Sequence, residues 1–168
     1  GLTVGDVDRD GRLDLLVLRA DGAVDRLTAT ATDWDAARLW TGPRLPGDAS
    51  PTTTRLFTGD LDNNGGLDVV RSTPGNGRIW LSDSTQSFVS WPRTLEQSVF
   101  SAADVRGEGR LDLLARGAGG SALRLTNRAT KNYQSQRIQP RAARARGDRR
   151  INPFGLGGEI ELRAGLLY

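Results

Sequence analysis

The sequence contains no cysteine, no histidine and no methionine among its 168 residues. Without cysteine it has no disulfide framework, no thiolate nucleophile and no Cys-ligated zinc. Without histidine it lacks the usual general base, the Ser-His-Asp triad and imidazole metal ligands. These absences argue against most enzyme classes. Because the chain lacks methionine and begins inside a repeated motif, at GLTVGD, we expect it to be part of a longer protein.

Long apolar runs are also absent. The longest, such as LLVL at 15–18, are far shorter than the roughly 20 residues that cross a bilayer as a helix. No signal peptide is visible in the sequence. We therefore expect no membrane span in this segment, and any export signal would lie upstream.

Lysine is nearly absent, because 23 basic residues include only Lys131 as a lysine. The arginines are scattered along the chain, which indicates a compositional bias rather than a selected binding face, despite the net charge of +3. One dense stretch, RAARARGDRR at 141–150, has no interleaved aromatic residues for base stacking. It is interpreted as a solvated linker, and the alternative is a patch that binds a polyanion. We do not expect a nucleic-acid partner.

A nine-residue motif occurs three times, as DVDRDGRLD at 6–14, DLDNNGGLD at 60–68 and DVRGEGRLD at 104–112. The first aspartates are separated by 54 and then 44 residues, a period typical of propellers and other repeat arrays. Each copy is preceded by a short extended segment and followed by an apolar run, a glycine-containing turn and further short runs.

These runs have the length and composition of β-strands, and four of them per repeat predict the blade of an antiparallel β-propeller. The second run of each repeat is almost continuously apolar, which predicts a strand buried on both faces, whereas RIWLSD and ALRLTN alternate as half-exposed strands do. Residues 33–40 could form a short helix, but a strand is favoured.

The predicted fold class is therefore all-β, with about three four-stranded antiparallel blades and a short C-terminal β segment. Three blades are too few to close a ring, so we expect an open fragment whose further blades lie on the N-terminal side. The predicted organisation is a repeat region at 1–130, an Arg-rich linker or strand at 131–150 and a further segment at 151–168. The expected blades span 1–50, 51–98 and 99–130.

The clustered acids of the first two motifs predict calcium binding. Calcium takes six to eight oxygen ligands, which a tight loop supplies from its positions 1, 3, 5, 7 (a backbone carbonyl) and 9, with a glycine at 6. The ligands predicted in the first loop are Asp6, Asp8, Asp10, the carbonyl of Arg12, and Asp14. Those predicted in the second loop are Asp60, Asp62, Asn64, the carbonyl of Gly66, and Asp68.

These loops are not EF-hands, because position 12 is Val17 in the first and Arg71 in the second, each inside a strand pattern. We expect about two structural Ca²⁺ ions in strand-loop-strand sites. The alternative interpretation is an Asp-rich hairpin whose carboxylates only bond loop amides.

The third motif departs from this ligand pattern. It keeps Asp104 and Asp112 but has Arg106 at position 3 and the longer Glu108 at position 5. We expect this loop to bind no ion. Instead, we expect the guanidinium group of Arg106 to pair with Asp104 and Asp112.

The pattern D-x-D-x-[DN]-G-x-L-D-[LV], at 6–15 and 60–69, resembles the FG-GAP/VCBS repeats of integrin-like propellers, over about residues 1–130. The resemblance implies calcium-bearing, mostly non-catalytic blades that serve adhesion, ligand binding or assembly. Residues 149–168 resemble the start of an ASPIC/UnbV domain, with Asn152, Gly155, Gly157 and Gly158 in its glycine-rich signature. The alternative for this short stretch is a glycine hairpin turn.

The leading hypothesis is a non-catalytic, calcium-stabilised module of an exported bacterial-type protein that binds a protein or glycan. Calcium sites of this kind are expected to have low affinity and to need the calcium concentrations found outside the cytosol. This predicts an extracellular, cell-surface or periplasmic location. The alternative is part of a secreted polysaccharide lyase or hydrolase, with the pairs Asp33 and Asp35 or Glu159 and Glu161 as candidates. Among the tryptophans we expect Trp80 to pack between blades, and Trp34 is left open as a glycan contact.

Overall fold

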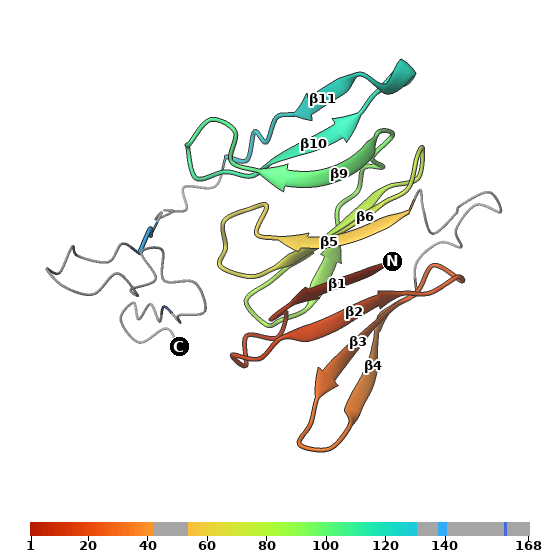
Figure 1. The fold of residues 1–168 in the computed structure, drawn as a ribbon, viewed down its shortest axis with the longest axis vertical. Coiled ribbons are helices and arrows are strands. Elements are labelled where there is room, and N and C mark those ends of the chain that lie inside the picture. Colours follow the sequence, from red (N-terminus) through yellow and green to blue (C-terminus); the bar gives the residue numbers. More distant parts are fainter. Residues whose placement is uncertain (42–53, 131–137, 141–159, 161–168) are drawn as a thin grey trace, which may run out of the picture. The chain divides into compact units, whose positions relative to one another are not determined.

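The computed structural model describes residues 1–41, 54–130, 138–140 and 160, and its strands form three antiparallel sheets (Figure 1). The chain divides into two units, residues 1–135 and 136–168, and the strands described below lie in the first. The predicted all-β class and the propeller-type blades are confirmed.

The first two sheets have four strands each and the third has three among the described residues. The first sheet contains β1 (Leu2–Gly5), β2 (Asp14–Leu18), β3 (Val24–Ala29) and β4 (Trp34–Trp40). The second contains β5 (Arg55–Gly59), β6 (Asp68–Ser72), β7 (Arg78–Ser82) and β8 (Phe88–Ser90). The third contains β9 (Ser98–Ala103), β10 (Asp112–Arg116) and β11 (Ala122–Leu125), with a short 3-10 turn at Ala118–Gly120.

Each sheet is an up-and-down meander in which consecutive strands pair. Residues 33–40, the possible helix, contain β4, so the favoured strand is what forms. Four strands were expected in each repeat, and the residues that follow the third strand of the last repeat, at 131–137, lie outside the described residues. The Arg-rich stretch at 141–150 and the glycines of 149–168 also lie outside them.

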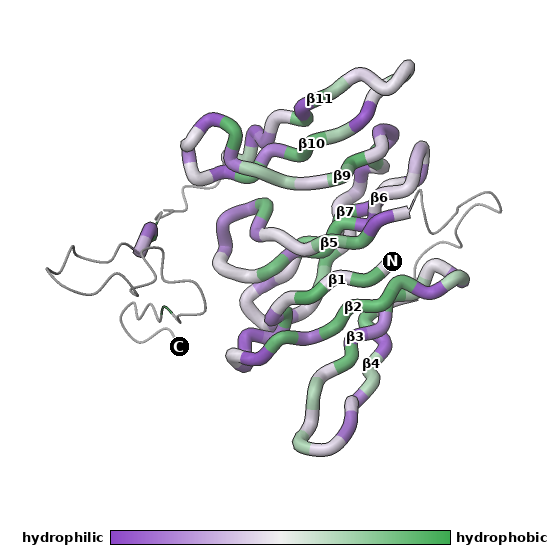
Figure 2. The backbone as a smooth tube through the Cα atoms, viewed as in Figure 1, coloured by the Kyte–Doolittle hydropathy of each residue, from purple (hydrophilic) through white to green (hydrophobic). Residues whose placement is uncertain are grey.

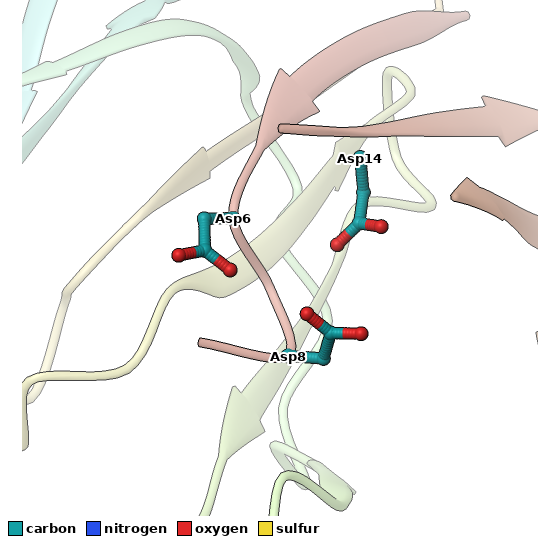
Figure 3. Close-up of side chains that lie close together, drawn as sticks. All are labelled: Asp6, Asp8 and Asp14. Atoms are coloured by element: carbon teal, nitrogen blue, oxygen red, sulfur yellow. The ribbon is translucent and has the colours of Figure 1, made fainter. Parts of the chain in front are cut away.

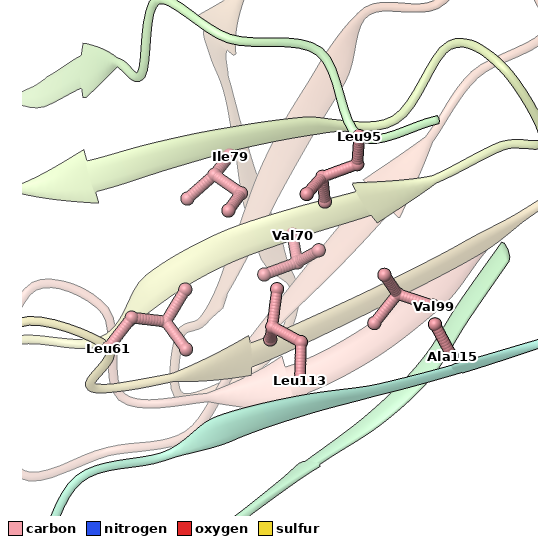
Figure 4. Close-up of a cluster of buried hydrophobic side chains, with 7 residues drawn as sticks. All are labelled: Leu61, Val70, Ile79, Leu95, Val99, Leu113 and Ala115. Carbon is pink, nitrogen blue, oxygen red and sulfur yellow. The ribbon is translucent and has the colours of Figure 1, made fainter. Parts of the chain in front are cut away.

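The sheets pack against one another through two apolar clusters. Val69 of β6 belongs to the cluster shared with the first sheet, and Val70 belongs to the cluster shared with the third. Neighbouring strand residues point to opposite faces, so these two valines place the second sheet between its neighbours. The cluster on the Val70 side is drawn in Figure 4 and consists of Leu61, Val70, Ile79, Leu95, Val99, Leu113 and Ala115.

Burial on both faces is complete in β6, where all five residues are buried, as its apolar run predicts. The same packing overrides the alternation expected for β7, because Ile79 and Trp80 are both buried. By contrast, β11 is largely exposed. In Figure 2 the connecting loops are mainly hydrophilic, while hydrophobic colour concentrates along the strands.

Aromatic side chains join the first and second sheets. The rings of Trp40 and Trp80 stack with centroids 4.4 Å apart, and Phe88 lies edge-on to Trp40 at 5.2 Å. Trp80 therefore packs between blades as expected, while Trp34 on β4 keeps 47% of its surface exposed. Within the described residues, no helix is long and apolar enough to cross a membrane.

Candidate metal centres

The three repeated motifs occupy the same place in each sheet, the connection between its first and second strands. Each motif ends on an aspartate that begins the second strand, opposite the last residue of the first. Asp14 pairs with Gly5, Asp68 with Gly59 and Asp112 with Ala103. The hairpin register therefore places this acid beside the loop that precedes it.

Three carboxylates meet in the first loop. Asp6, Asp8 and Asp14 each offer an oxygen atom, and these atoms all lie within 4.8 Å of one another (Figure 3). Two of the acids come from the loop and Asp14 comes from the start of β2, so the group joins the loop to the sheet.

The second loop gathers the equivalent residues. Asp60, Asp62 and Asp68 offer oxygen atoms within the same 4.8 Å limit. Both groups contain the predicted ligands at positions 1, 3 and 9 of their loops. Two independent copies with the same geometry show that the spacing in the sequence brings these acids together.

The acid at position 9 is the most buried member of each group. Asp14 is 1% exposed and Asp68 is fully buried. Asp68 accepts hydrogen bonds from the backbone N–H groups of Leu61 (2.7 Å) and Ser82 (2.8 Å), on either side of it. Its carboxyl group is thus fixed between the loop and the neighbouring strand β7.

Burial raises the pKa of Asp68 to about 6, from its usual 3.8. The charges of Asp62 and Asp60 also raise the pKa, whereas the hydrogen bonds from Ser82 and Leu61 oppose the increase. In the first loop, burial and then the charge of Asp14 raise the pKa of Asp8. These carboxylates are therefore costly to ionise together without a positive charge between them.

The predicted ligands at position 5 have a second role in the loop. The side-chain oxygen of Asp10 accepts a hydrogen bond from the N–H of Arg12 at 2.8 Å, and that of Asn64 accepts one from Gly66 at 2.7 Å. The Asn64 amide also donates to the carbonyl of Ser82 at 2.6 Å. The ligand roles of Asp10, Asn64 and the carbonyls at position 7 stay predictions.

The alternative of a simple Asp-rich turn explains part of these loops. Both oxygens of Asp6 accept from loop amides, those of Asp10 and Gly11, at 3.1 and 3.0 Å. Amide bonding accounts for the fold of the turn, but it gives no reason for Asp8 to approach the buried Asp14. The carboxylate convergence has a separate cause, to which a neighbouring guanidinium, that of Arg26, contributes in the first loop.

The donor set fits calcium. Oxygen atoms bound to one calcium ion at 2.3–2.6 Å lie at most roughly 5 Å apart, and the oxygen atoms of each group are within that span. All the donors are oxygens, which a hard cation prefers, and carbonyls or water can complete six to eight ligands.

The first site contains a cation that the sequence pattern did not reveal. Arg26, on β3, lies with its Nη1 2.9 Å from the Asp8 carboxylate. Arg26 is opposite Leu16 in the strand register, so it reaches the loop only through sheet formation. This guanidinium would compete with any metal ion for Asp8.

Adjacent loops contact each other through the residue at position 4. Arg9 and Asn63 both have positive φ, 59° and 57°, which turns their side chains toward the next repeat. Arg9 donates to the carbonyl of Asp83 at 3.3 Å and packs over Gly66, while Asn63 donates to the carbonyl of Gly109 at 2.7 Å. The glycine at Gly66 leaves the space that Arg9 occupies.

The third loop keeps its turn without gathering three acids. Asp104 accepts hydrogen bonds from the N–H groups of Glu108 (2.9 Å) and Gly109 (2.8 Å). Arg106 lies 3.1 Å from Glu108, which was not an expected partner, and 3.9 Å from Asp112, one of its two expected partners. Within the described residues, the acids of this loop form no group of three that could hold a metal.

The other candidate residues are only partly described. Asp33 and Asp35 are both exposed at the start of β4, and Asp33 accepts a hydrogen bond from the N–H of Trp34. Glu159 and Glu161 lie outside the described residues. The ASPIC/UnbV resemblance of 149–168 has no support in the comparisons below and stays a prediction.

Comparison with known families identifies the repeat. The model of the FG-GAP-like repeat matches residues 60–115, about a third of the chain. The matched stretch runs from the first ligand of the second loop, through β6 to β9 and the third loop, into β10. Searches of curated proteins and of solved structures gave no match. The match and the three sheets together support an FG-GAP repeat protein built from propeller-type β-blades.

Proposed function

We propose that the chain is a non-catalytic, calcium-stabilised β-propeller module of an exported protein, and that its blades bind a protein or glycan partner. One observation carries the proposal: two loops at equivalent places each gather three carboxylates, of which one is buried at the start of a strand. An FG-GAP-like repeat supports the same interpretation.

The chain's own residues would hold the ion at the junction of loop and sheet. In the second site Asp60 and Asp62 would bind it from the loop and Asp68 from the start of β6. Bound calcium supplies the positive charge that allows these three carboxylates to ionise together. Since Asp68 also accepts from Ser82 on β7, the ion would stabilise the pairing of three strands, β5, β6 and β7.

The proposed location follows from calcium concentration. Oxygen-ligand sites in extracellular modules have dissociation constants of roughly 10⁻⁴ to 10⁻³ M, which extracellular calcium fills and cytosolic calcium does not. The same reasoning covers the cell surface and the periplasm. The exposed ring of Trp34 on β4, an edge strand of the first sheet, is a candidate contact for the partner.

Calcium titration with thermal unfolding and equilibrium dialysis tests the proposal. We expect two bound ions per chain, and about 2.7 kcal/mol of added stability for each site at a calcium concentration 100 times its dissociation constant. Asp8→Ala and Asp62→Ala should each remove one ion and its share of the stabilisation. Asp104→Ala, in the third loop, is the control and should leave metal uptake unchanged.

A folded chain that takes up no calcium, and melts at the same temperature with and without it, would contradict the calcium proposal. Cleavage of acidic polysaccharides by the purified chain, persisting in the double variant Asp8→Ala/Asp62→Ala, would contradict the non-catalytic assignment.

A further inference from the structure

The third loop has the same turn as the two loops that gather three acids, but an arginine replaces one of its acids. Asp104 accepts from the N–H groups at positions 5 and 6 of its loop at 2.9 and 2.8 Å. Asp60 accepts from the same positions of the second loop at 3.0 and 2.9 Å. The second and third loops therefore share the same hydrogen-bonding pattern in their turns. What differs is the set of side chains that each turn presents.

One arginine stands where the other two loops have an acidic side chain among their predicted ligands. Arg106 occupies position 3, which is Asp8 in the first loop and Asp62 in the second. Arg110 occupies position 7, as Arg12 does in the first loop, where only the backbone carbonyl is a predicted ligand. Arg124 on β11 lies opposite Leu114 in the register and reaches toward the same place.

Two acids of the same loop, Glu108 and Asp112, form ion pairs with these arginines. Arg106 and Arg110 lie 3.1 and 2.9 Å from Glu108, and Arg106 and Arg124 each lie 3.9 Å from Asp112. Glu108 and Asp112 thereby restrain the guanidinium groups on one side. The side chains of Arg106, Arg110 and Arg124 keep 34%, 38% and 44% of their surface accessible.

The accessible sides of these arginines line an open cavity of about 710 Å³. The lining contains four arginines and no acid, and it consists of Arg106, Arg110, Arg124, Thr126, Asn127, Arg128, Ala129 and Thr130. Asn127 is held in place because its amide donates to the carbonyls of Leu61 (2.6 Å) and Leu111 (3.1 Å). Arg110 similarly donates to the carbonyl of Ala129 at 3.1 Å. Hydrogen bonds to backbone carbonyls thus hold some of the donor side chains of the cavity wall in place.

We propose that this cavity binds a small oxyanion that carries two or more carboxylate or phosphate groups. The planar guanidinium fork pairs with carboxylate and phosphate oxygens through two parallel hydrogen bonds. The volume lies in the range of small-molecule pockets, so a single phosphate would leave it mostly empty, while several arginines can engage a multiply charged ligand.

Isothermal titration calorimetry of the full chain tests the site, in buffer freed of metal with a chelating resin, because soluble chelators are themselves polycarboxylates. The probes are citrate for the carboxylate class and pyrophosphate for the phosphate class, with sulfate as a smaller anion. We expect saturable one-site binding of citrate or pyrophosphate, at least tenfold tighter than sulfate and weakened by added salt. The probe that binds more tightly identifies the class.

The double variant Arg106→Gln/Arg124→Gln should weaken binding at least tenfold. Arg26→Gln is the matched control, because Arg26 occupies in the first sheet the register position of Arg124, and it should change binding less than twofold. Since Arg106 and Arg124 also face the buried Asp112, circular dichroism checks the fold of the double variant. The exposed Arg128→Gln serves as a second variant and should weaken binding two- to fivefold.

The proposal is overturned if no probe shows saturable binding to the folded chain. It is equally overturned if Arg26→Gln weakens binding as much as the double variant does, or if neither the double variant nor Arg128→Gln weakens it. None of these results depends on calcium, so they leave the calcium proposal to its own test.

Discussion

Calcium should stabilise this protein more as the pH rises from about 4.5 to 7.5, because of the buried carboxyl group of Asp68. Its pKa is raised from 3.8 to about 6 in the folded chain without metal, chiefly by burial. A raised pKa means that folding favours the protonated acid. Its contribution to stability is therefore complete below about pH 4 and is lost as the pH rises through 6.

The size of the effect follows from the shift. About two pKa units at roughly 1.4 kcal/mol each give a loss near 3 kcal/mol for the calcium-free chain between pH 4 and pH 7.5. The raised pKa of Asp8 adds to the loss with the same sign. The depressed pKa values of Asp25 and Asp83 act in the opposite direction, and only as the pH falls below their usual range near 4.

Urea unfolding at pH 4.5, 5.5, 6.5 and 7.5 measures this dependence, once with metal-free protein and once with 10 mM calcium. We expect the free energy of unfolding to fall with pH in the first series. In the second it should stay level or rise, because calcium binds the ionised form. The control is Asp68→Ala, which is less stable at every pH and should lose most of the slope.

Two results would refute the reasoning. One is a metal-free chain whose stability rises steadily over this interval, since that would mean that Asp68 is ionised at no cost. The other is an unchanged slope in the Asp68→Ala variant, which would place the titration elsewhere in the chain.

Two further predictions concern packing. Gly66→Ala should cost about 1–3 kcal/mol, because an added Cβ would collide with the side chains of Arg9 and Ser82, and urea unfolding should show a smaller cost when Arg9 is already alanine. Val70→Ala should cost about 2 kcal/mol, since Val70 is fully buried between the second and third sheets, whereas Val89→Ala at a position 60% exposed should cost less than about 0.5 kcal/mol by the same assay. Equal losses for the two valines would contradict the described packing between sheets.

The strands and the acid clusters could be predicted because they depend on residues close together in the chain. Asp6, Asp8 and Asp14 lie within nine residues, and a glycine turn followed by a strand brings them together. In the third loop Arg106 at position 3 likewise indicated an ion pair with Asp112, one of its two expected partners, and the prediction that this loop binds no ion stays a prediction.

Contacts between residues distant in the chain determined features that the local sequence pattern could not predict. The alternation in RIWLSD predicts a half-exposed strand, yet β7 buries both Ile79 and Trp80 because sheets cover it on two sides. Likewise Arg26, twelve residues beyond Asp14, contacts the acids of the first loop only because β3 pairs with β2.

The sequence alone determined the periodic carboxylates, the hairpin turns that gather them, and the arginine that replaces one of them in the third loop. These are properties of short segments, set by backbone turn preferences and by residue spacing. Tertiary structure decided that Asp68 is buried and hard to ionise, that Arg9 covers Gly66, and that arginines from a loop and from β11 line one cavity. Desolvation and contact depend on which surfaces the packed sheets cover, and that is a property of the assembled chain rather than of any segment in it.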